Sequence, residues 1–328
     1  METGPLKALR RKASRSPLRV LFPESADSRV LLAAAAMAEN GLAQPLLLGR
    51  PPFQSWHQAL GKRLGPENWL DPHDQARRLR VVEYIRQARR HRGMTQGQSH
   101  VLAMEPLYHA CAMVGMGEVD ALVVGATYPT ADVARAALWC VGPQEEIGTV
   151  SGAFLMLESL DHGICFMMAD CAVVPDPNVE QLVTIAHTTA RNYRRLFERQ
   201  PAVAFLSFST RGSADHPAAH KVATATRQLA ASEPDWPVVG EVQVDAALIP
   251  EIAQSKGVDW GENHRADVLV FPDLASGNIG QKLMERLGPW RAVGPLLQGL
   301  RRPVCDLSRG CAALDIYDAA VLVTLTAG

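Results

Sequence analysis

The stretch ALVVGATYPT, residues 121–130, joins an apolar run to a short loop of small, hydroxyl-bearing and proline residues. Four consecutive aliphatic residues are typical of a strand buried on both faces of a parallel sheet. Residues 131–141 follow with helical spacing, so the segment predicts a strand, a loop and a helix in succession. Ligands of α/β proteins bind beyond the carboxyl ends of such strands, which makes 125–130 the first loop to inspect.

The same alternation extends along the chain in both directions. It predicts an α/β fold with mainly parallel sheets that helices cover on both faces. A third kind of segment, 51–72, contains four prolines and predicts an irregular loop. The predicted strands are 19–22, 45–48, 121–125, 154–157, 164–168, 203–208 and 268–271, and the predicted helices are 28–40, 131–141, 178–199 and 278–287.

Two breaks in the pattern divide the 328 residues into two lobes. One break lies at residues 142–146 and the other at Gly294-Pro295, and they enclose a block with strands and helices of its own. A second lobe inserted between two parts of the first explains both breaks. The prediction is a first α/β lobe of residues 1–146 plus 298–328, a second of residues 147–297, and a cleft between them.

The composition excludes several classes of function. Lys and Arg total 33 against 34 Asp and Glu, and this net charge of −1 provides no overall field for nucleic acid or an anionic membrane. No apolar run approaches the ~18–20 residues that span a bilayer. The six cysteines form no Cys-x-x-Cys pair, which favours packing roles in a reducing cytosol. The basic stretch 6–19 is interpreted as a surface helix rather than a targeting peptide, because no apolar core follows it.

The loop 125–130 has the ingredients of a phosphate site. Backbone N–H groups at a helix start, the hydroxyl of Thr130 and the guanidinium of Arg135 together suit a phosphate. The alternative is that Thr130 caps the helix and that Arg135 is a solvated charge. The residues alone leave both interpretations open.

A second polar loop follows the predicted strand 203–208. Its hydroxyls, from Ser207, Ser209 and Ser213, form a turn suited to an anion or a polar substrate. Serine clusters are also ordinary loop material, so this loop has a structural interpretation as well.

The segment richest in chemistry lies near the C-terminal end of the printed sequence. A hydroxyl, a guanidinium and a carboxylate, from Ser308, Arg309 and Asp315, stand within eight residues, and glycines beside them let a ligand approach the backbone. Asp315 also fits the first turn of a helix, where a carboxylate offsets the helix dipole without any catalytic part. No Gly-x-Gly-x-x-Gly follows a strand, and neither a Gly-x-x-x-x-Gly-Lys loop nor a His-Glu-x-x-His motif occurs.

Several motifs in this order resemble the phosphate acetyltransferases, especially the short single-module type of ethanolamine-utilisation operons. The resemblance runs from Phe22-Pro23-Glu24 to the C-terminal helix. Its most specific pieces are Leu206-Ser207-Phe208-Ser209 with Gly212-Ser213, Gly240-Glu241-Val242-Gln243-Val244-Asp245-Ala246-Ala247, Phe271-Pro272-Asp273 with Gly277-Asn278-Ile279, Gly294-Pro295 with Gln298-Gly299, and Asp306-Leu307-Ser308-Arg309-Gly310-Cys311.

The resemblance implies a fold and an assembly. Two αβα lobes of the isocitrate/isopropylmalate dehydrogenase type would enclose the active site in an interlobe cleft, in a cytoplasmic homodimer. The ethanolamine-utilisation type adds association with a bacterial microcompartment as an option. The reaction would be reversible acetyl transfer between acetyl-CoA and phosphate, giving acetyl phosphate and CoA, by direct thiolate attack in a ternary complex.

The resemblance also implies roles for individual residues. Asp315 would take the proton of the CoA thiol, Ser308 would stabilise the oxyanion, and Arg309 would hold phosphate. No metal and no permanently bound cofactor is implied, since coenzyme A is a substrate. The implied substrate-binding residues are Arg135, Thr130, Arg89, Ser207, Ser209, Ser213, Gln298 and Gly299.

Three other functions remain open on the sequence. A phosphate butyryltransferase-like enzyme uses the same chemistry on a longer acyl group, and Tyr128-Pro129 and Gly152, which depart from the family pattern, leave the acyl preference undecided. A non-catalytic module that senses acetyl-CoA is the second, although Ser308, Arg309 and Asp315 argue against it. A dehydrogenase of similar fold is the third, but the sequence lacks the aspartate cluster that such an enzyme uses for its metal.

Overall fold

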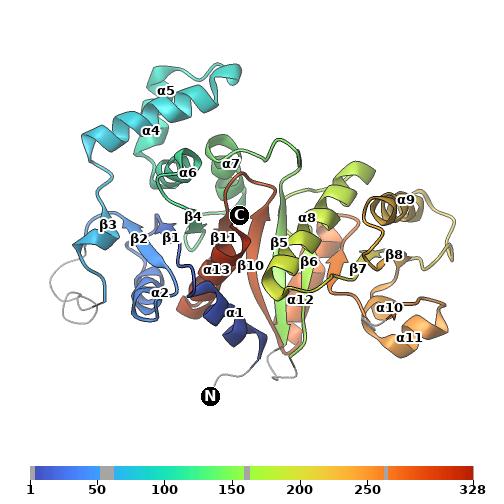
Figure 1. The fold of residues 1–328 in the computed structure, drawn as a ribbon. Helices are drawn as coiled ribbons and strands as arrows, with labels where there is room; N and C mark the ends of the chain where they lie inside the picture. Colours follow the sequence, from blue (N-terminus) through green and yellow to red (C-terminus); the bar gives the residue numbers. More distant parts are fainter. Residues whose placement is uncertain (1–3, 52–62, 159–162, 262–264, 328) are drawn as a thin grey trace. The chain divides into compact units, whose positions relative to one another are not determined.

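The structure is a computed structural model that describes residues 4–51, 63–158, 163–261 and 265–327. The chain divides into two compact units, which are described separately below. The N-terminal unit comprises Leu6–Glu145 and Leu300–Gly328, and the middle unit comprises Glu146–Gly299 with Met1–Pro5. Each unit contains part of a sheet flanked by helices (Figure 1).

The sheet of the N-terminal unit is parallel throughout. Because parallel strands end at the same edge, the loops that follow the three neighbouring strands β1, β4 and β11 meet there. The strands lie in the order β3 (Trp69–Leu70), β2 (Gln44–Leu48), β1 (Arg19–Phe22), β4 (Ala121–Val124) and β11 (Val304–Asp306).

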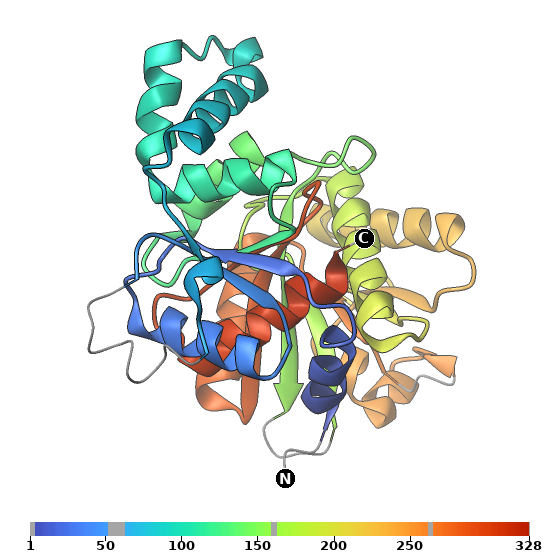
Figure 2. The same cartoon turned by 60° about the vertical axis from the view of Figure 1, so that its left-hand side comes forward.

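Helices cover both faces of this sheet. Helices α2 (Ser28–Glu39) and α13 (Ala313–Thr326) lie on one face, and α6 (Pro106–Met116) and α7 (Thr130–Cys140) lie on the other (Figures 1 and 2). Helix α13 is apolar almost all round and is buried along most of its length, which makes it a core element.

Three further helices surround this core. Helix α1 (Pro5–Ala13) is tied to α13 by Arg10, whose guanidinium donates to the buried Asp318 at 2.8 and 3.0 Å. Helices α4 (Gln75–Ala88) and α5 (Gln96–Met104) project beyond the sheet and pack on α6 (Figure 2).

The middle unit has a mixed sheet. Its strands β6, β9, β7 and β8 are parallel, whereas β5 is antiparallel to both β6 and β10. The order is β10 (Trp290–Gln298), β5 (Ser151–Glu158), β6 (Cys165–Ala169), β9 (Val268–Val270), β7 (Val203–Leu206) and β8 (Val238–Val242). The helices are α8 (Val179–Phe197), α9 (Pro217–Ser232), α10 (Val244–Leu248), α11 (Pro250–Ser255) and α12 (Leu274–Leu287).

The α/β fold predicted from the sequence is confirmed, and each predicted strand and helix appears with shifts at its ends. Part of the loop predicted at 51–72 is wrong, because Trp69–Leu70 pairs with β2 as a short strand and Pro66–Asn68 forms a 3₁₀ turn. Residues 52–62 of that prediction lie outside the described residues. The strand predicted at 203–208 ends at Leu206, since the chain turns at Ser207 and exposes Phe208.

Two further observations concern the cysteines and the apolar helices. All six cysteines are buried and free of disulfides, in agreement with packing roles. Within the described ranges, no helix combines the length and apolar character that crossing a bilayer requires.

Candidate functional site

The loop after β4 is held by a carboxylate from the loop after β1. Glu24, only 8% exposed, accepts hydrogen bonds from the N–H groups of Gly125 at 2.9 Å, Ala126 at 3.0 Å and Thr127. The Thr127 hydroxyl donates to the same carboxylate at 2.6 Å. Glu24 therefore occupies the ring of donors in the first half of the loop, and the phosphate predicted for loop 125–130 would have to use its second half.

Arg29, in the first turn of α2, ties two loops of this edge together. Its guanidinium donates to the carbonyl of Ala126 at 2.9 Å and to those of Arg309 at 2.8 Å and Cys311 at 2.9 Å. It also forms an ion pair with Asp27 at 2.7 Å, and this hydrogen bond lowers the pKa of the Asp27 carboxyl. The guanidinium is thus fixed on four sides between the loops after β4 and β11.

The loop after β11 presents the predicted hydroxyl and guanidinium at the surface of the N-terminal unit. Ser308 and Arg309 are exposed, and the Ser308 carbonyl accepts the Cys311 N–H at 2.9 Å, which closes the loop into a turn. Among the described residues, no hydrogen bond or ion pair engages the Arg309 guanidinium. Its backbone is fixed by Arg29 while its side chain remains available to an anion.

Asp315 lies in the first turn of helix α13, which follows this loop. Its Oδ2 accepts the Ala312 N–H at 2.8 Å, which satisfies a donor at the helix start. Asp315 therefore does have the structural role at the start of a helix that the sequence suggested. It also fixes the carboxylate next to the Ser308–Gly310 turn.

Asp306, the last residue of β11, faces Gly125 across the two loops. A Cβ built on Gly125, whose φ is +110°, would lie 2.1 Å from the Asp306 Oδ1 and 2.7 Å from the Leu307 nitrogen. The position therefore requires glycine, because both the backbone angle and the close approach exclude a side chain. This contact sets the spacing between the loops after β4 and β11.

Thr130 and Arg135 lie along helix α7, which starts at the same edge. The Thr130 hydroxyl lies near the Asp306 carboxyl and lowers its pKa, against the larger effect of burial. Arg135 is half exposed and forms an ion pair with Asp132 at 2.7 Å, so part of its charge is already compensated. The alternative that Thr130 caps the helix is wrong, because Pro129 is the N-cap residue and no side chain in the described part of the chain caps this end, whereas Arg135 does have the exposed position of a solvated charge.

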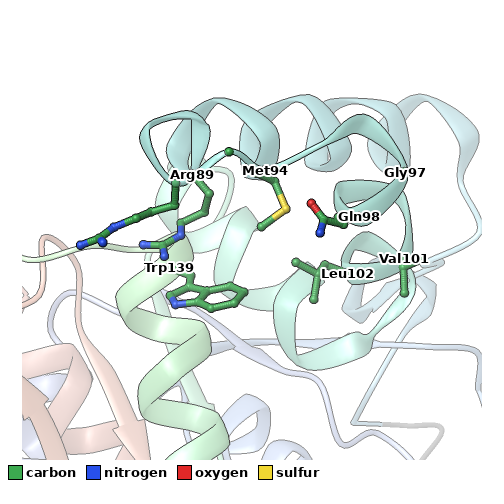
Figure 3. Close-up of a pocket in the computed structure, with 9 residues that line it drawn as sticks. Arg89, Met94, Gly97, Gln98, Val101, Leu102 and Trp139 are labelled. Carbon is green, nitrogen blue, oxygen red and sulfur yellow. The ribbon is translucent and has the colours of Figure 1, made fainter.

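Arg89 lies at the C-terminal end of helix α4, above the aromatic ring of Trp139, a residue of α7. Its guanidinium carbon is 4.7 Å from the ring centroid of Trp139, and its Nε is buried with no hydrogen-bond partner in the described chain. The pair borders a hollow of about 660 Å³ between α5 and α7. Figure 3 shows Met94, Gln98 and Leu102 beside the Trp139 indole. The hollow combines apolar walls with two cations, Arg89 and Arg92.

The three predicted serines belong to the middle unit and surround a second buried glutamate. Ser209 is fully buried and donates to the Glu241 Oε1 at 2.9 Å, and the Gly212 N–H donates to the same oxygen at 2.6 Å. The Ser207 Oγ accepts the Ser209 N–H, and the Ser213 Oγ accepts the Thr210 N–H. Ser209 is thus committed to the turn, whereas Ser213 is exposed and Ser207 is partly exposed.

Gln298 and Gly299 also belong to the middle unit. The Gln298 Nε2 donates to the hydroxyls of Ser151 at 2.8 Å and Thr189 at 2.7 Å, and its Oε1 accepts from Asn192 at 3.2 Å. Both amide protons are therefore engaged inside the unit. A Cβ on Gly299 would meet the Thr149 carbonyl at 2.4 Å, so this glycine permits a close backbone approach.

Comparison with known proteins settles the family. The family model described as phosphate acetyl/butaryl transferase matches residues 6–324. The phosphate acetyltransferase of Thermoanaerobacterium thermosaccharolyticum is 37% identical over 98% of this chain and 99% of its own length. The chain belongs to the phosphate acetyl/butaryl transferase family. The family predicted from the sequence motifs is thereby confirmed.

Solved structures of this transferase family agree. The EutD phosphotransacetylase from Staphylococcus aureus has a TM-score of 0.86 at 33% identity, with 99% of this chain and 98% of that chain covered. A phosphotransacetylase from Streptococcus pyogenes has a TM-score of 0.87 at 36% identity, with 98% of both chains covered. A branched-chain phosphotransacylase from Enterococcus faecalis, 18% identical over 94% of this chain and 99% of that chain, shares the fold with a TM-score of 0.67.

For this transferase, the structure brings some predicted site residues together. Ser308, Arg309 and Asp315 lie at the carboxyl edge of the sheet in the N-terminal unit, and Thr130 lies at the neighbouring loop. Arg135 follows along α7, and Arg89, at the end of α4, contacts Trp139 of α7. Among the described residues, no group of three or more His, Cys, Asp or Glu is arranged to hold a metal ion.

The sequence interpretation missed Glu24, Arg29 and Asp306, although a signal for them existed. Glu24 and Arg29 follow the predicted strand 19–22, and the rule that directs attention to strand carboxyl ends applies to that strand too. Asp306 ends a short strand that was not predicted. Burial raises the pKa of Cys311 to about 11, so this thiol stays protonated at neutral pH and packs, as predicted.

Gly125→Ala tests the contact between the two loops of the transferase. The added methyl forces an unfavourable φ and displaces Asp306 and Leu307, so we expect a loss of about 2 kcal/mol or more in the free energy of unfolding. Urea titration monitored by circular dichroism measures it. Gly97→Ala is the control, because Gly97 lies in α5 with no atom within 4 Å of its Cβ position. The control should gain up to about 1 kcal/mol from helix propensity. Equal effects of the two changes would contradict the packing argument.

Proposed function

We propose that this protein is a phosphate acetyltransferase that passes an acetyl group reversibly between acetyl-CoA and phosphate. The observation that carries the proposal is the turn Ser308–Gly310 with Asp315 fixed beside it, in a chain that belongs to this transferase family. A hydroxyl, an unpaired guanidinium and a carboxylate at one edge are the groups that acyl transfer from a phosphate requires.

In the proposed reaction, the CoA thiol attacks the carbonyl carbon of acetyl phosphate. A thiol with a pKa near ~8.5 is only a few per cent thiolate at neutral pH, so Asp315 accepts its proton as the C–S bond forms. The carbonyl oxygen gains negative charge, which the Ser308 hydroxyl stabilises. One preorganised donor of this kind lowers the barrier by about 3–4 kcal/mol.

Collapse of that intermediate breaks the bond between carbon and the bridging oxygen, and phosphate leaves. Arg309 binds the phosphoryl oxygens, since a guanidinium offers parallel N–H donors and stays charged at every working pH. The reverse direction uses the same groups, with phosphate as the nucleophile and the proton returning from Asp315 to the thiolate.

Coenzyme A would lie along helix α7 in this proposal. Thr130 and Trp139 are nine residues apart, which corresponds to about 14 Å along the helix axis. An extended coenzyme therefore has room to place its thiol near the Ser308 turn and its phosphorylated nucleotide near Arg89. Arg135 lies between these ends, and the hollow beside Trp139 offers both an apolar wall and cations.

Substrate binding stays a prediction for the candidate residues of the middle unit, which are Ser207, Ser209, Ser213, Gln298 and Gly299. The hydrogen bonds of Ser209 and Gln298 favour indirect parts for these two, because their side chains already support the local fold. Ser207 and Ser213 retain more exposure and are the better choices for direct contact.

We also propose a homodimer and a cytoplasmic location, with microcompartment association as an option of the ethanolamine-utilisation resemblance. The homodimer is supported by an exposed apolar stripe on α12, where Ile279, Leu283 and Leu287 are 57%, 53% and 83% exposed at a spacing of four residues. Sedimentation of the purified chain at the mass of one copy would contradict it.

The activity itself is tested with acetyl-CoA and butyryl-CoA. We expect phosphate-dependent release of CoA from acetyl-CoA, measured with a thiol reagent, at a higher kcat/KM than from butyryl-CoA. Faster turnover of butyryl-CoA would assign the butyryltransferase reaction instead. Tyr128, a departure from the family pattern, is partly buried beside Glu24 and is the residue that leaves the acyl preference undecided. Tight acetyl-CoA binding without turnover would establish the sensing module.

Asp315→Asn tests the base. Asparagine retains an oxygen that accepts the Ala312 N–H, so the start of α13 and the melting temperature should be preserved. Loss of a general base lowers kcat by about 10²–10⁴-fold with little change in the KM for acetyl phosphate. An unchanged kcat at neutral pH would refute the assignment.

Arg89→Gln tests the coenzyme end. Loss of a charged hydrogen bond worth about 1.5–3 kcal/mol should raise the KM for CoA by about 10-fold or more and leave the KM for acetyl phosphate unchanged. Arg86→Gln on the same helix is the control, because Arg86 is paired with Glu83 outside the hollow. A similar KM for CoA in both variants would exclude Arg89 from the coenzyme site.

A further inference from the structure

Two buried carboxyl groups flank the Gly125 turn, and their surroundings are opposite. Glu24 accepts hydrogen bonds from three backbone N–H groups and one hydroxyl. Asp306 is 0% exposed, and neither of its oxygens has a hydrogen-bond partner among the described residues. Such hydrogen bonds favour the charged form of a carboxyl, whereas burial without them favours the neutral form.

The position of Asp306 prevents it from finding donors without movement. It sits over the Cα of Gly125, with its Oδ1 only 2.1 Å from the place of a Cβ. The Thr130 hydroxyl and the Leu307 N–H lie close enough to act on it electrostatically, but neither hydrogen bond has good geometry. The backbone donors of Gly125, Ala126 and Thr127 are engaged by Glu24.

The charges around Asp306 oppose its ionisation as well. Burial raises the pKa of Asp306 from 3.8 to about 7, and the negative charge of Glu24 adds to the rise. Cys305, the preceding residue of β11, is a buried thiol whose pKa burial raises well above the ordinary value, so it brings no charge near Asp306. Arg29, the cation of the neighbouring network, is engaged by Asp27 and by three backbone carbonyls.

We infer that Asp306 is a positioning residue whose protonated, neutral side chain keeps the Gly125–Thr130 turn seated against the Leu307–Gly310 loop. The effect on catalysis rests on the proposed function, because Ser308 and Arg309 lie in the second loop. The protonation itself does not depend on that function.

Ionisation of Asp306 would disturb both loops at once. A buried carboxylate needs donors, and those within reach are the Leu307 N–H, one residue before Ser308, and the Thr130 hydroxyl at the start of α7. Drawing them in shifts the Ser308 turn and the helix that carries Arg135. Activity should therefore decline as pH rises through about 7, for a reason separate from the titration of Asp315 or the thiol.

The sign of the stability effect follows from proton linkage. An aspartate in the unfolded chain loses its proton near pH 4, whereas the folded chain keeps that proton to about pH 7. The wild type is therefore penalised increasingly between these values, and the full penalty persists above them. Asp306→Asn cannot ionise and escapes the penalty. Its folding equilibrium constant, relative to wild type, should rise by about tenfold or more between pH 5 and pH 8.5.

The experiment is urea unfolding of wild type and Asp306→Asn at both pH values, with Asp318→Asn as the matched control. Asp318 is an equally buried aspartate of the same unit, but it is paired with Arg10 at 2.7 Å. Its replacement should weaken folding at pH 8.5 by removing a charged partner, opposite in sign to Asp306→Asn. If Asp306→Asn loses stability relative to wild type as pH rises, Asp306 is an ionised group and the inference is overturned.

Activity supplies a second readout that a purely structural role would not move. In wild type, kcat should fall above about pH 7, and in Asp306→Asn this decline should disappear while the pH dependence below 7 remains. An unchanged decline in the variant overturns the positioning role even when the unfolding result stands. If the wild type releases no CoA under any condition, the proposed function fails, and the unfolding experiment still decides the protonation of Asp306.

Discussion

The carboxylate of Glu24 is the constraint on which the candidate site depends. It gathers three N–H groups and a hydroxyl of the Gly125–Thr127 turn, and so fixes the loop after β4 to the loop after β1. With that turn in place, Asp306 packs on Gly125, and Arg29 spans Ala126 and Arg309. Glu241 plays a comparable part in the middle unit by holding Ser209 and Gly212. Buried acids thus shape both sets of loops before any substrate binds.

Much of the fold was predictable because its signals are local. Apolar runs such as 121–124 and 203–206 are buried strands whose patterns are present in a few consecutive residues. The strands β8, β10 and β11 were not predicted, since Gly240, Gly294 and Pro295 interrupt the first two and β11 is only three residues long. Helices α4 and α5 were missed for another reason: they project from the core and carry many charged and polar residues, so their apolar period is weak.

The candidate site was predictable in part. Ser308, Arg309 and Asp315 lie close in sequence and follow one strand, so spacing alone was enough to group them. The roles of Gln298 and Ser209 depend on partners more than thirty residues away, which no local pattern reveals. The contrast between Glu24, which accepts four hydrogen bonds, and Asp306, which accepts none from the described residues, is also invisible in the local sequence. It depends on which of the two buried carboxyl groups the donors of the Gly125–Thr127 turn reach. Sequence position grouped the candidate residues on loops, but only the three-dimensional contacts showed which of their side chains already support the backbone.

The hydrogen bonds of Arg29 have a consequence for sequence variation. Apart from Asp27 and the Cys311 sulfur at 3.9 Å, its guanidinium contacts main-chain carbonyls, those of Ala126, Arg309 and Cys311. A carbonyl is present whatever side chain a residue carries, so the exposed position 309 can change without breaking the tie, whereas Ala126 and Cys311 are buried and constrained by packing. Selection or engineering can therefore change the side chain displayed at position 309 while Arg29 preserves the geometry of the two loops.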